Sequence, residues 1–236
     1  MALILHIETA TDVCSVALSN ENGLIDIRES TEGRSHASIL TVFIDELLKK
    51  NTFVVPQLQA IAVSMGPGSY TGLRIGVSVA KGLCYGGDIP LIALPTLQSM
   101  VFGYLRQQKE KPGMTSGDAC YCPMLDARRL EVYTALFNCQ GEFASETKAE
   151  IINEHSFEDI LANQTVYFFG NGSDKCSGII THPNARFIPG LNPSAQDMIT
   201  LSQKLYKKKE FKDVAYFEPF YLKDFVATTP KNKVLG

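Results

Sequence analysis

The sequence feature that most constrains the fold is the stretch GPGSYTGLRIGVSVAKGL at residues 66–83, which directly follows the apolar run QAIAVSM. A proline between two glycines predicts a rigid turn, and Ser69 or Thr71 can cap a helix that begins there. The predicted helix ends near residue 85, and the short apolar run PLIAL follows it. Strand, helix and strand in this order predict a parallel crossover, and therefore an α/β sheet covered by helices.

A similar order of elements is predicted in each half of the chain. Each half opens with three strands, at residues 3–9, 13–19 and 24–30 and at residues 119–127, 130–138 and 143–151. An amphipathic helix from about residue 35 precedes the glycine-rich stretch. In the second half the strands are followed by a helix at residues 157–163, a strand at residues 165–170 and a helix that opens after GNGS.

This duplicated plan resembles the superfamily of actin-like, Hsp70-like and sugar-kinase ATPases, which have a ribonuclease H-like core. We expect a first lobe at residues 1–100 and a second, reduced lobe at residues 101–236, joined through an exposed loop at residues 107–119. The resemblance implies that a last helix, at about residues 195–209, packs back toward the first lobe. The remaining tail is expected to be poor in strands and partly mobile.

Composition excludes several classes of protein. A net charge of −3 over 236 residues argues against direct binding to the phosphate backbone of a nucleic acid without a partner. No apolar run reaches membrane-spanning length, and no secretory leader is recognised. The six cysteines are therefore predicted to be reduced thiols, with Cys120 and Cys122 buried on one face of a strand, in a cytoplasmic protein.

The glycine-rich stretch is not a Walker A loop, because Leu73 and Arg74 follow Gly72 where that motif needs Lys and Ser or Thr. Glycine lowers helix propensity, so its frequency here needs a reason. Close packing on the sheet and close approach of a partner helix both explain the small residues, and the two explanations stay open. The small residues are Gly72, Gly76, Ala80 and Gly82.

The superfamily holds nucleotide phosphates between two hairpin loops that carry Asp and nearby glycines. Both loops depart from this pattern, since the first reads ETAT from Glu8 and the second reads DAR from Asp126. The GNG segment has two interpretations, an adenosine-contacting loop or a turn that needs positive φ before a helix. We predict no cofactor and negligible ATP turnover by this chain alone. The candidate vestigial nucleotide residues are Glu8, Thr9, Gly66, Gly68, Ser69, Asp126, Gly170 and Gly172.

Four segments together resemble the TsaB family. They are ILHIETATDVCSVAL, the glycine-rich stretch itself, LDARRLEVY and PFYLKDFVA, in this order along nearly the whole chain. The resemblance implies a non-catalytic subunit that supports TsaD in transferring threonylcarbamoyl to the adenosine next to the anticodon of tRNA. It also implies a third partner, the small ATPase TsaE, and tRNA contact only through the complex.

The resemblance further implies that the first-lobe helices pair with TsaD. Residues of the glycine-rich helix predicted to project toward this partner are Tyr70, Arg74, Val77, Ser78 and Lys81. A partly solvated helix face is the alternative interpretation. The same face also predicts a homodimer when the partner is absent.

No catalytic or metal-binding residue is predicted. TsaD-like proteins place two histidines four residues apart on their first long helix, whereas here His36 is followed by Leu40 at that spacing. A metallopeptidase is therefore the least favoured function, and a small-molecule kinase or ATPase of the same fold is the main alternative. A basic run at the last helix is interpreted as a solvated helix end or as a phosphate contact. Its members are Lys204, Lys207, Lys208, Lys209 and Lys212.

Overall fold

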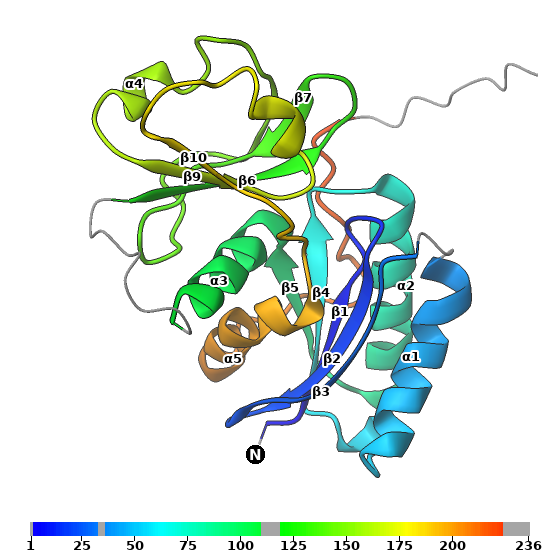
Figure 1. Ribbon diagram of the computed structural model, residues 1–236. Coiled ribbons are helices and arrows are strands. Elements are labelled where there is room, and N and C mark those ends of the chain that lie inside the picture. Colours follow the sequence, from blue (N-terminus) through cyan, green and yellow to red (C-terminus); the bar gives the residue numbers. More distant parts are fainter. Residues whose placement is uncertain (1, 33–35, 110–118, 224–236) are drawn as a thin grey trace, which may run out of the picture.

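The computed structural model describes residues 2–32, 36–109 and 119–223, and two five-stranded sheets organise them (Figure 1). The first sheet has the order β3-β2-β1-β4-β5. Its strands are β1 (Ile4–Glu8), β2 (Cys14–Asn20), β3 (Gly23–Ser30), β4 (Ala60–Gly66) and β5 (Leu91–Pro95). The first three strands are antiparallel, whereas β4 and β5 run parallel to β1, as the predicted meander and crossover require.

The second sheet repeats this topology in the order β10-β9-β6-β7-β8. Its strands are β6 (Cys120–Asp126), β7 (Glu131–Thr134), β8 (Lys148–Ile151), β9 (Val166–Phe169) and β10 (Ala185–Ile188). Strands β6, β7 and β8 are antiparallel, and β9 and β10 continue the sheet in parallel with β6. The duplicated α/β plan is therefore confirmed, with one strand, β10, that the sequence analysis did not predict.

The outer face of the first sheet is covered by two long helices, α1 (His36–Lys50) and α2 (Tyr70–Gly87) (Figure 1). Leu40, Ile44, Leu47 and Leu48 form the buried stripe of α1, which is the amphipathic pattern read from the sequence. The 3-10 turn η1 (Val55–Gln57) leads from α1 toward β4. Alternate residues of the strands, such as Ile7 and Val63, complete this core.

The corresponding elements of the second lobe are much shorter. α4 (Glu158–Leu161) has 4 residues, and the helix predicted after GNGS is only a 3-10 turn, η2 (Asp174–Cys176), of 3 residues. The prediction of a longer helix was wrong, because the helical turn ends at Cys176. Ile180, a few residues later, packs into the core. The two long helices that cover the outer face of a sheet, α1 and α2, therefore both belong to the first lobe.

Two helices, α3 (Thr96–Lys109) and α5 (Ile199–Lys208), lie on the side of the first sheet opposite α1 and α2, and α3 lies nearer to the second sheet (Figure 1). α3 follows β5, yet Met100 and Tyr104 pack against Tyr121 and Phe169 of the second sheet. The turn η3 (Ala195–Met198) and α5 follow the second sheet but pack on the first. The expected boundary at residue 100 falls inside α3, a helix that the sequence analysis missed.

After α5 the chain returns along the first lobe as a segment without strands, residues 210–223, here termed the C-terminal segment. The Lys212 amide donates to Leu91 O at 2.8 Å, and the Phe220 amide donates to Met65 O at 2.7 Å. The predicted helix start at Ser35, most of the predicted loop at residues 107–119 and the end of the tail lie outside the described residues.

The cysteines behave as the sequence predicts. All six are free thiols, and Cys120 and Cys122 are both buried in the core on the outer side of the second sheet. Among the described helices, none has the length and apolar character that a membrane crossing requires.

Candidate functional site

The turn into α2 is held by hydrogen bonds within the chain. Gly66 has φ +110° and precedes a cis peptide bond to Pro67. The Ser69 amide donates to Ala10 O at 2.7 Å, and Ser69 Oγ accepts from the Gly72 amide at 3.2 Å. Two of the amides at this helix start are thus bonded to the loop after β1 and to the capping serine rather than open to a phosphate.

Three glycines allow α2 to touch that loop. A Cβ at Gly68 would lie 2.4 Å from Ala10 O, and one at Gly72 would lie 2.1 Å from Thr9 O. At Gly76 the Cβ would lie 2.2 Å from Thr9 Oγ1, a hydroxyl that donates to Gly72 O at 2.9 Å. Close packing inside the chain therefore explains these glycines. It does not explain Gly82, where a Cβ would meet nothing within 4 Å.

Glu8 ends β1 with its side chain fully buried. Its Oε1 accepts hydrogen bonds from the Ala10 amide at 2.7 Å and from Ser64 Oγ at 2.9 Å. Burial raises the pKa of Glu8 to about 7, although these hydrogen bonds oppose the shift. The carboxyl group is thus turned into the protein and stabilises its own loop.

The second hairpin loop is closed in a comparable way. Asp126 Oδ1 accepts from the Arg128 amide at 3.0 Å and also pairs with the Lys175 ammonium. Gly170 has φ +105°, and a Cβ there would lie 2.3 Å from Met124 O, while one at Gly172 would lie 2.8 Å from Leu125 C. The GNG segment packs directly on the end of β6, so the turn interpretation accounts for its glycines. In each hairpin loop the acidic side chain, Glu8 or Asp126, is thus bonded within the chain.

The exposed side of α2 carries most of the predicted partner-binding residues. Arg74 stacks its guanidinium over the Tyr70 ring at 4.4 Å, and Ser78 is exposed. Val77 is only 4% exposed and belongs to the core, so its placement on the exposed face was wrong. The Val77 side chain belongs to the core cluster of the first lobe, against which Phe217 also packs.

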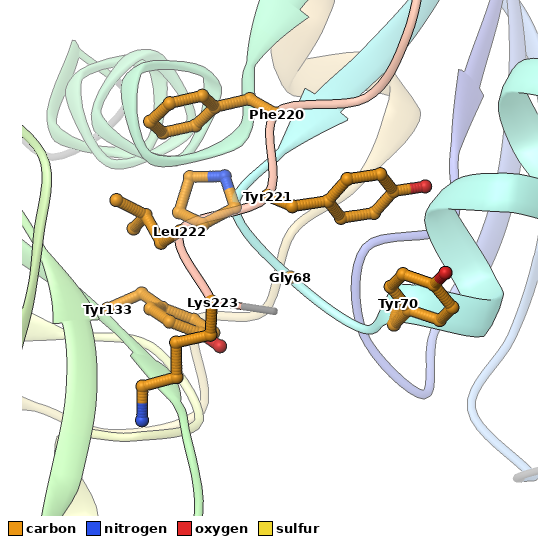
Figure 2. Close-up of a pocket in the computed structure, with 8 residues that line it drawn as sticks. Gly68, Tyr70, Tyr133, Phe220, Tyr221, Leu222 and Lys223 are labelled. Carbon is orange, nitrogen blue, oxygen red and sulfur yellow. The ribbon is translucent and has the colours of Figure 1, made fainter. Parts of the chain in front are cut away.

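The C-terminal segment lies along this side of α2, which the sequence analysis did not foresee. Lys81 Nζ donates to Ala215 O at 3.1 Å and to Phe217 O at 3.0 Å. The Tyr70 and Tyr221 rings lie 4.9 Å apart between centroids. Figure 2 shows Tyr221 and Leu222 between Tyr70 of α2 and Tyr133 of the second sheet. The segment thus bridges the two lobes, since Lys223 also pairs with Glu131.

Two hollows flank the C-terminal segment. The hollow between the lobes, shown in Figure 2, has a volume of about 30 Å³ and holds no more than one or two water molecules. The other is a groove of about 220 Å³ along α2. It is lined by Arg74, Val77, Ser78 and Lys81 from α2 and by Phe217, Glu218, Pro219 and Tyr221 from the C-terminal segment.

Histidines do not gather at a metal site in the part of the chain that the structure describes, where no group of three or more His, Cys, Asp or Glu residues could hold a metal ion. His36 Nε2 lies 3.2 Å from Val13 O at the start of α1. His6 is buried with Nε2 2.7 Å from Ser202 Oγ, and burial lowers its pKa to about 4. His155 is exposed and pairs with Glu158.

The chain is similar to known proteins both in sequence and in fold. A family model described as TsaD, tRNA N6-adenosine threonylcarbamoyltransferase, matches residues 27–231. The curated protein TsaB of Escherichia coli K12 is 29% identical over 95% of this chain and 96% of its own length. The chain belongs to the TsaB group of this family. TsaB of Haemophilus influenzae is likewise 29% identical, over 94% of each chain.

Several solved structures have a fold similar to that of this TsaB-group chain. An uncharacterized Pseudomonas aeruginosa protein with similarity to peptidase YEAZ has 26% identity and a TM-score of 0.81, covering 94% of this chain and 100% of its own. YeaZ from the same organism has 25% identity and a TM-score of 0.75 over the same shares. An Arthrobacter polyphosphate/ATP-glucomannokinase, at 8% identity and a TM-score of 0.53, shares the fold alone.

Proposed function

We propose that this chain is a non-catalytic cytoplasmic subunit in the formation of threonylcarbamoyladenosine in tRNA, acting beside a TsaD-like transferase. The biosynthetic role is the one printed in the names of its TsaB relatives. The observation that carries the non-catalytic part is the contact of Gly68, Gly72 and Gly76 with Thr9 and Ala10. This contact holds the first hairpin loop against α2, and the loop, which reads ETAT, lacks the Asp and the glycines with which the superfamily binds phosphate.

The surface proposed to receive the TsaD-like partner is the outer stripe of α2. Ser78, Gly82 and Gly86 are exposed, and Tyr85 is 87% exposed. These positions recur every three or four residues and therefore share one helix face. Small residues let a second helix approach closely, and an exposed aromatic side chain supplies the large contact area typical of interface anchors.

Reconstitution of tRNA modification tests the role. The reaction contains the TsaD-like protein, the TsaE-like ATPase and threonylcarbamoyl-adenylate, with and without this chain. We expect threonylcarbamoyladenosine to accumulate only when the chain is present. Full activity in its absence would falsify the subunit role.

A matched pair of glycines tests the docking face. Gly82 on α2 and Gly178 after η2 are both exposed, and a Cβ at either would meet nothing within 4 Å. Gly82→Leu is expected to lower the affinity for the TsaD-like partner at least tenfold in calorimetry, because the leucine side chain would occupy the space proposed for the partner helix. Gly178→Leu is the control, and equal affinities of the two variants would exclude α2 as the docking face.

The same experiments separate the alternatives. Calorimetric binding of ATP with magnesium to the isolated chain would favour a kinase or ATPase and contradict the proposal. Sedimentation of the chain alone is expected to show self-association through the α2 stripe, which Gly82→Leu abolishes. Association with the TsaE-like ATPase is proposed for the assembled complex and is measured there.

A further inference from the structure

The most uneven charge on the molecule lies at the end of α5. The segment 204–212, here termed the basic helix end, reads KLYKKKEFK and contains five lysines and one acidic residue, although the whole chain carries a net charge of −3. The lysines are all exposed, at positions Lys204, Lys207, Lys208, Lys209 and Lys212. Such a concentration of one sign creates a local positive field on an acidic protein.

These ammonium groups differ from the other lysines in their pairing. Among the described residues, only Lys208 of the five pairs with a carboxylate, Glu210 at 3.5 Å. Every other lysine whose side chain the structure describes binds a carboxylate or a backbone carbonyl. These are Lys49, Lys50, Lys81, Lys148, Lys175 and Lys223. The basic helix end is therefore an unneutralised cluster rather than a network of ion pairs.

Stabilisation of α5 does not account for the cluster. Cations favour the last turn of a helix, which explains Lys207 and Lys208. Lys204 stands a turn earlier, and Lys212 stands beyond the helix, where its amide is bonded to Leu91 O at 2.8 Å. At least two of the five positions thus lie outside the reach of the helix dipole.

The cluster is held on ordered backbone and includes an aromatic surface. The chain reverses after Lys209, which has φ +56°, and the Tyr206 and Phe211 rings then lie 5.8 Å apart. Phe211 remains 37% exposed among the lysines. Cations interleaved with an exposed ring suit a single-stranded nucleic acid, whose phosphates pair with lysine and whose bases stack on aromatic faces.

The position of the cluster leaves it available during docking. α5 packs on the small side chains of the first sheet, including Ala60 and Ala62, whereas α1 and α2 pack on the opposite face of the same sheet (Figure 1). A partner that covers the outer stripe of α2 therefore lies across the first sheet from α5 and its lysines, whereas Lys212 lies at the edge strand β5. Both surfaces can be occupied at once.

We infer that the basic helix end contacts the phosphate backbone of tRNA in the assembled complex. This inference rests on the proposed function, which supplies the complex. Lysines act as point charges, so the contact positions the tRNA without reading its sequence. An acidic surface of the ATPase subunit is the competing occupant that the experiment distinguishes.

The test uses the complex of this chain with the TsaD-like protein and an unmodified transcript of a tRNA that carries the modification. Lys204→Glu/Lys207→Glu is compared with Lys148→Glu/Arg186→Glu, which changes the net charge equally through exposed cations of the second sheet. Fluorescence anisotropy at several salt concentrations measures tRNA affinity. Gel filtration of each complex, without and with the TsaE-like ATPase, establishes that pairing with the TsaD-like protein is intact and shows whether the ATPase subunit still binds.

The expected result is a loss of tRNA affinity of about tenfold or more for Lys204→Glu/Lys207→Glu, with a salt slope reduced by about 1 to 2, since each lost phosphate contact contributes about 0.7 to 0.9. Lys204→Arg/Lys207→Arg retains the parental affinity. Equal tRNA affinity and slope in the test and control variants overturn the inference, including when the test variant loses only the ATPase subunit. Failure of the parental chain to pair with the TsaD-like protein is a failure of the proposed function, which gel filtration reveals separately.

Discussion

Replacing Gly72 with alanine tests whether contact within the chain is what requires glycine in α2. A Cβ at this position would lie 2.1 Å from Thr9 O and 3.3 Å from Ser69 Cβ. The oxygen belongs to the backbone, so the clash is relieved only if the loop after β1 moves. That loop is tied to α2 by the Ser69 amide at 2.7 Å and by the Thr9 hydroxyl at 2.9 Å, so movement breaks hydrogen bonds as well.

The magnitude follows from two opposing effects. Overpacking a filled site costs about 1–3 kcal/mol, and a contact this short with backbone belongs at the upper end, about 3 kcal/mol. Alanine regains at most about 1 kcal/mol of helix propensity. The expected net loss in the free energy of unfolding is about 2 kcal/mol, which lowers Tm by about 4–8 °C in a chain of this size.

Gly82→Ala is the matched control on the same helix. A Cβ there would meet nothing within 4 Å, so only the propensity gain of about 1 kcal/mol remains and Tm rises by about 2–4 °C. Far-UV circular dichroism during heating measures both variants, since the chain has no tryptophan to report by fluorescence. A Gly72→Ala protein as stable as the parent would refute the claim that Thr9 excludes a side chain.

Three further predictions concern buried and bridging groups. Burial raises the pKa of Glu8 from 4.5 to about 7, so its ionisation destabilises the fold progressively as pH rises through this window. Glu8→Gln keeps an acceptor oxygen, and urea unfolding should show it more stable than the parent by about 3 kcal/mol at pH 8, with no difference near pH 4.5; a less stable variant at pH 8 contradicts this. Lys81→Met removes both bonds to the C-terminal segment and should speed hydrogen exchange at the Phe220 amide, whereas Lys148→Met should not. Of six thiols, a disulfide reagent should titrate only Cys139 in the native protein, because the other five are buried; reaction of more than one without denaturant would disprove this.

Much of the fold could be predicted because its signals are local. The apolar stripe of α1 and the turn and cap before α2 are periodicities and residue preferences that nearby residues determine. The duplication was readable for the same reason, since each lobe begins with an antiparallel meander. α3 also carries Leu97, Met100, Val101 and Tyr104 at helical spacing, so this helix was detectable from the sequence although it was missed.

The remaining features depend on contacts between distant residues. Nothing near Gly170 and Gly172 indicates that their neighbour is the end of β6 rather than a nucleotide. The C-terminal segment lacks periodicity, and its position depends on Lys81, which reaches carbonyls more than a hundred residues away in sequence. A pattern of residue types shows which side chains can form hydrogen bonds, but not which backbone groups they bond to.

Four glycines of α2 divide into two sets with different causes. Gly72 and Gly76 face Thr9 and are required by the fold, whereas Gly82 and Gly86 face open space and lower the stability of the helix without any internal gain. The proposed close approach of a partner helix would compensate for this cost. Gly82→Ala/Gly86→Ala is therefore expected to raise Tm while weakening calorimetric binding to the TsaD-like partner. A variant that is more stable and binds with unchanged affinity would show that these glycines serve neither the fold nor the interface.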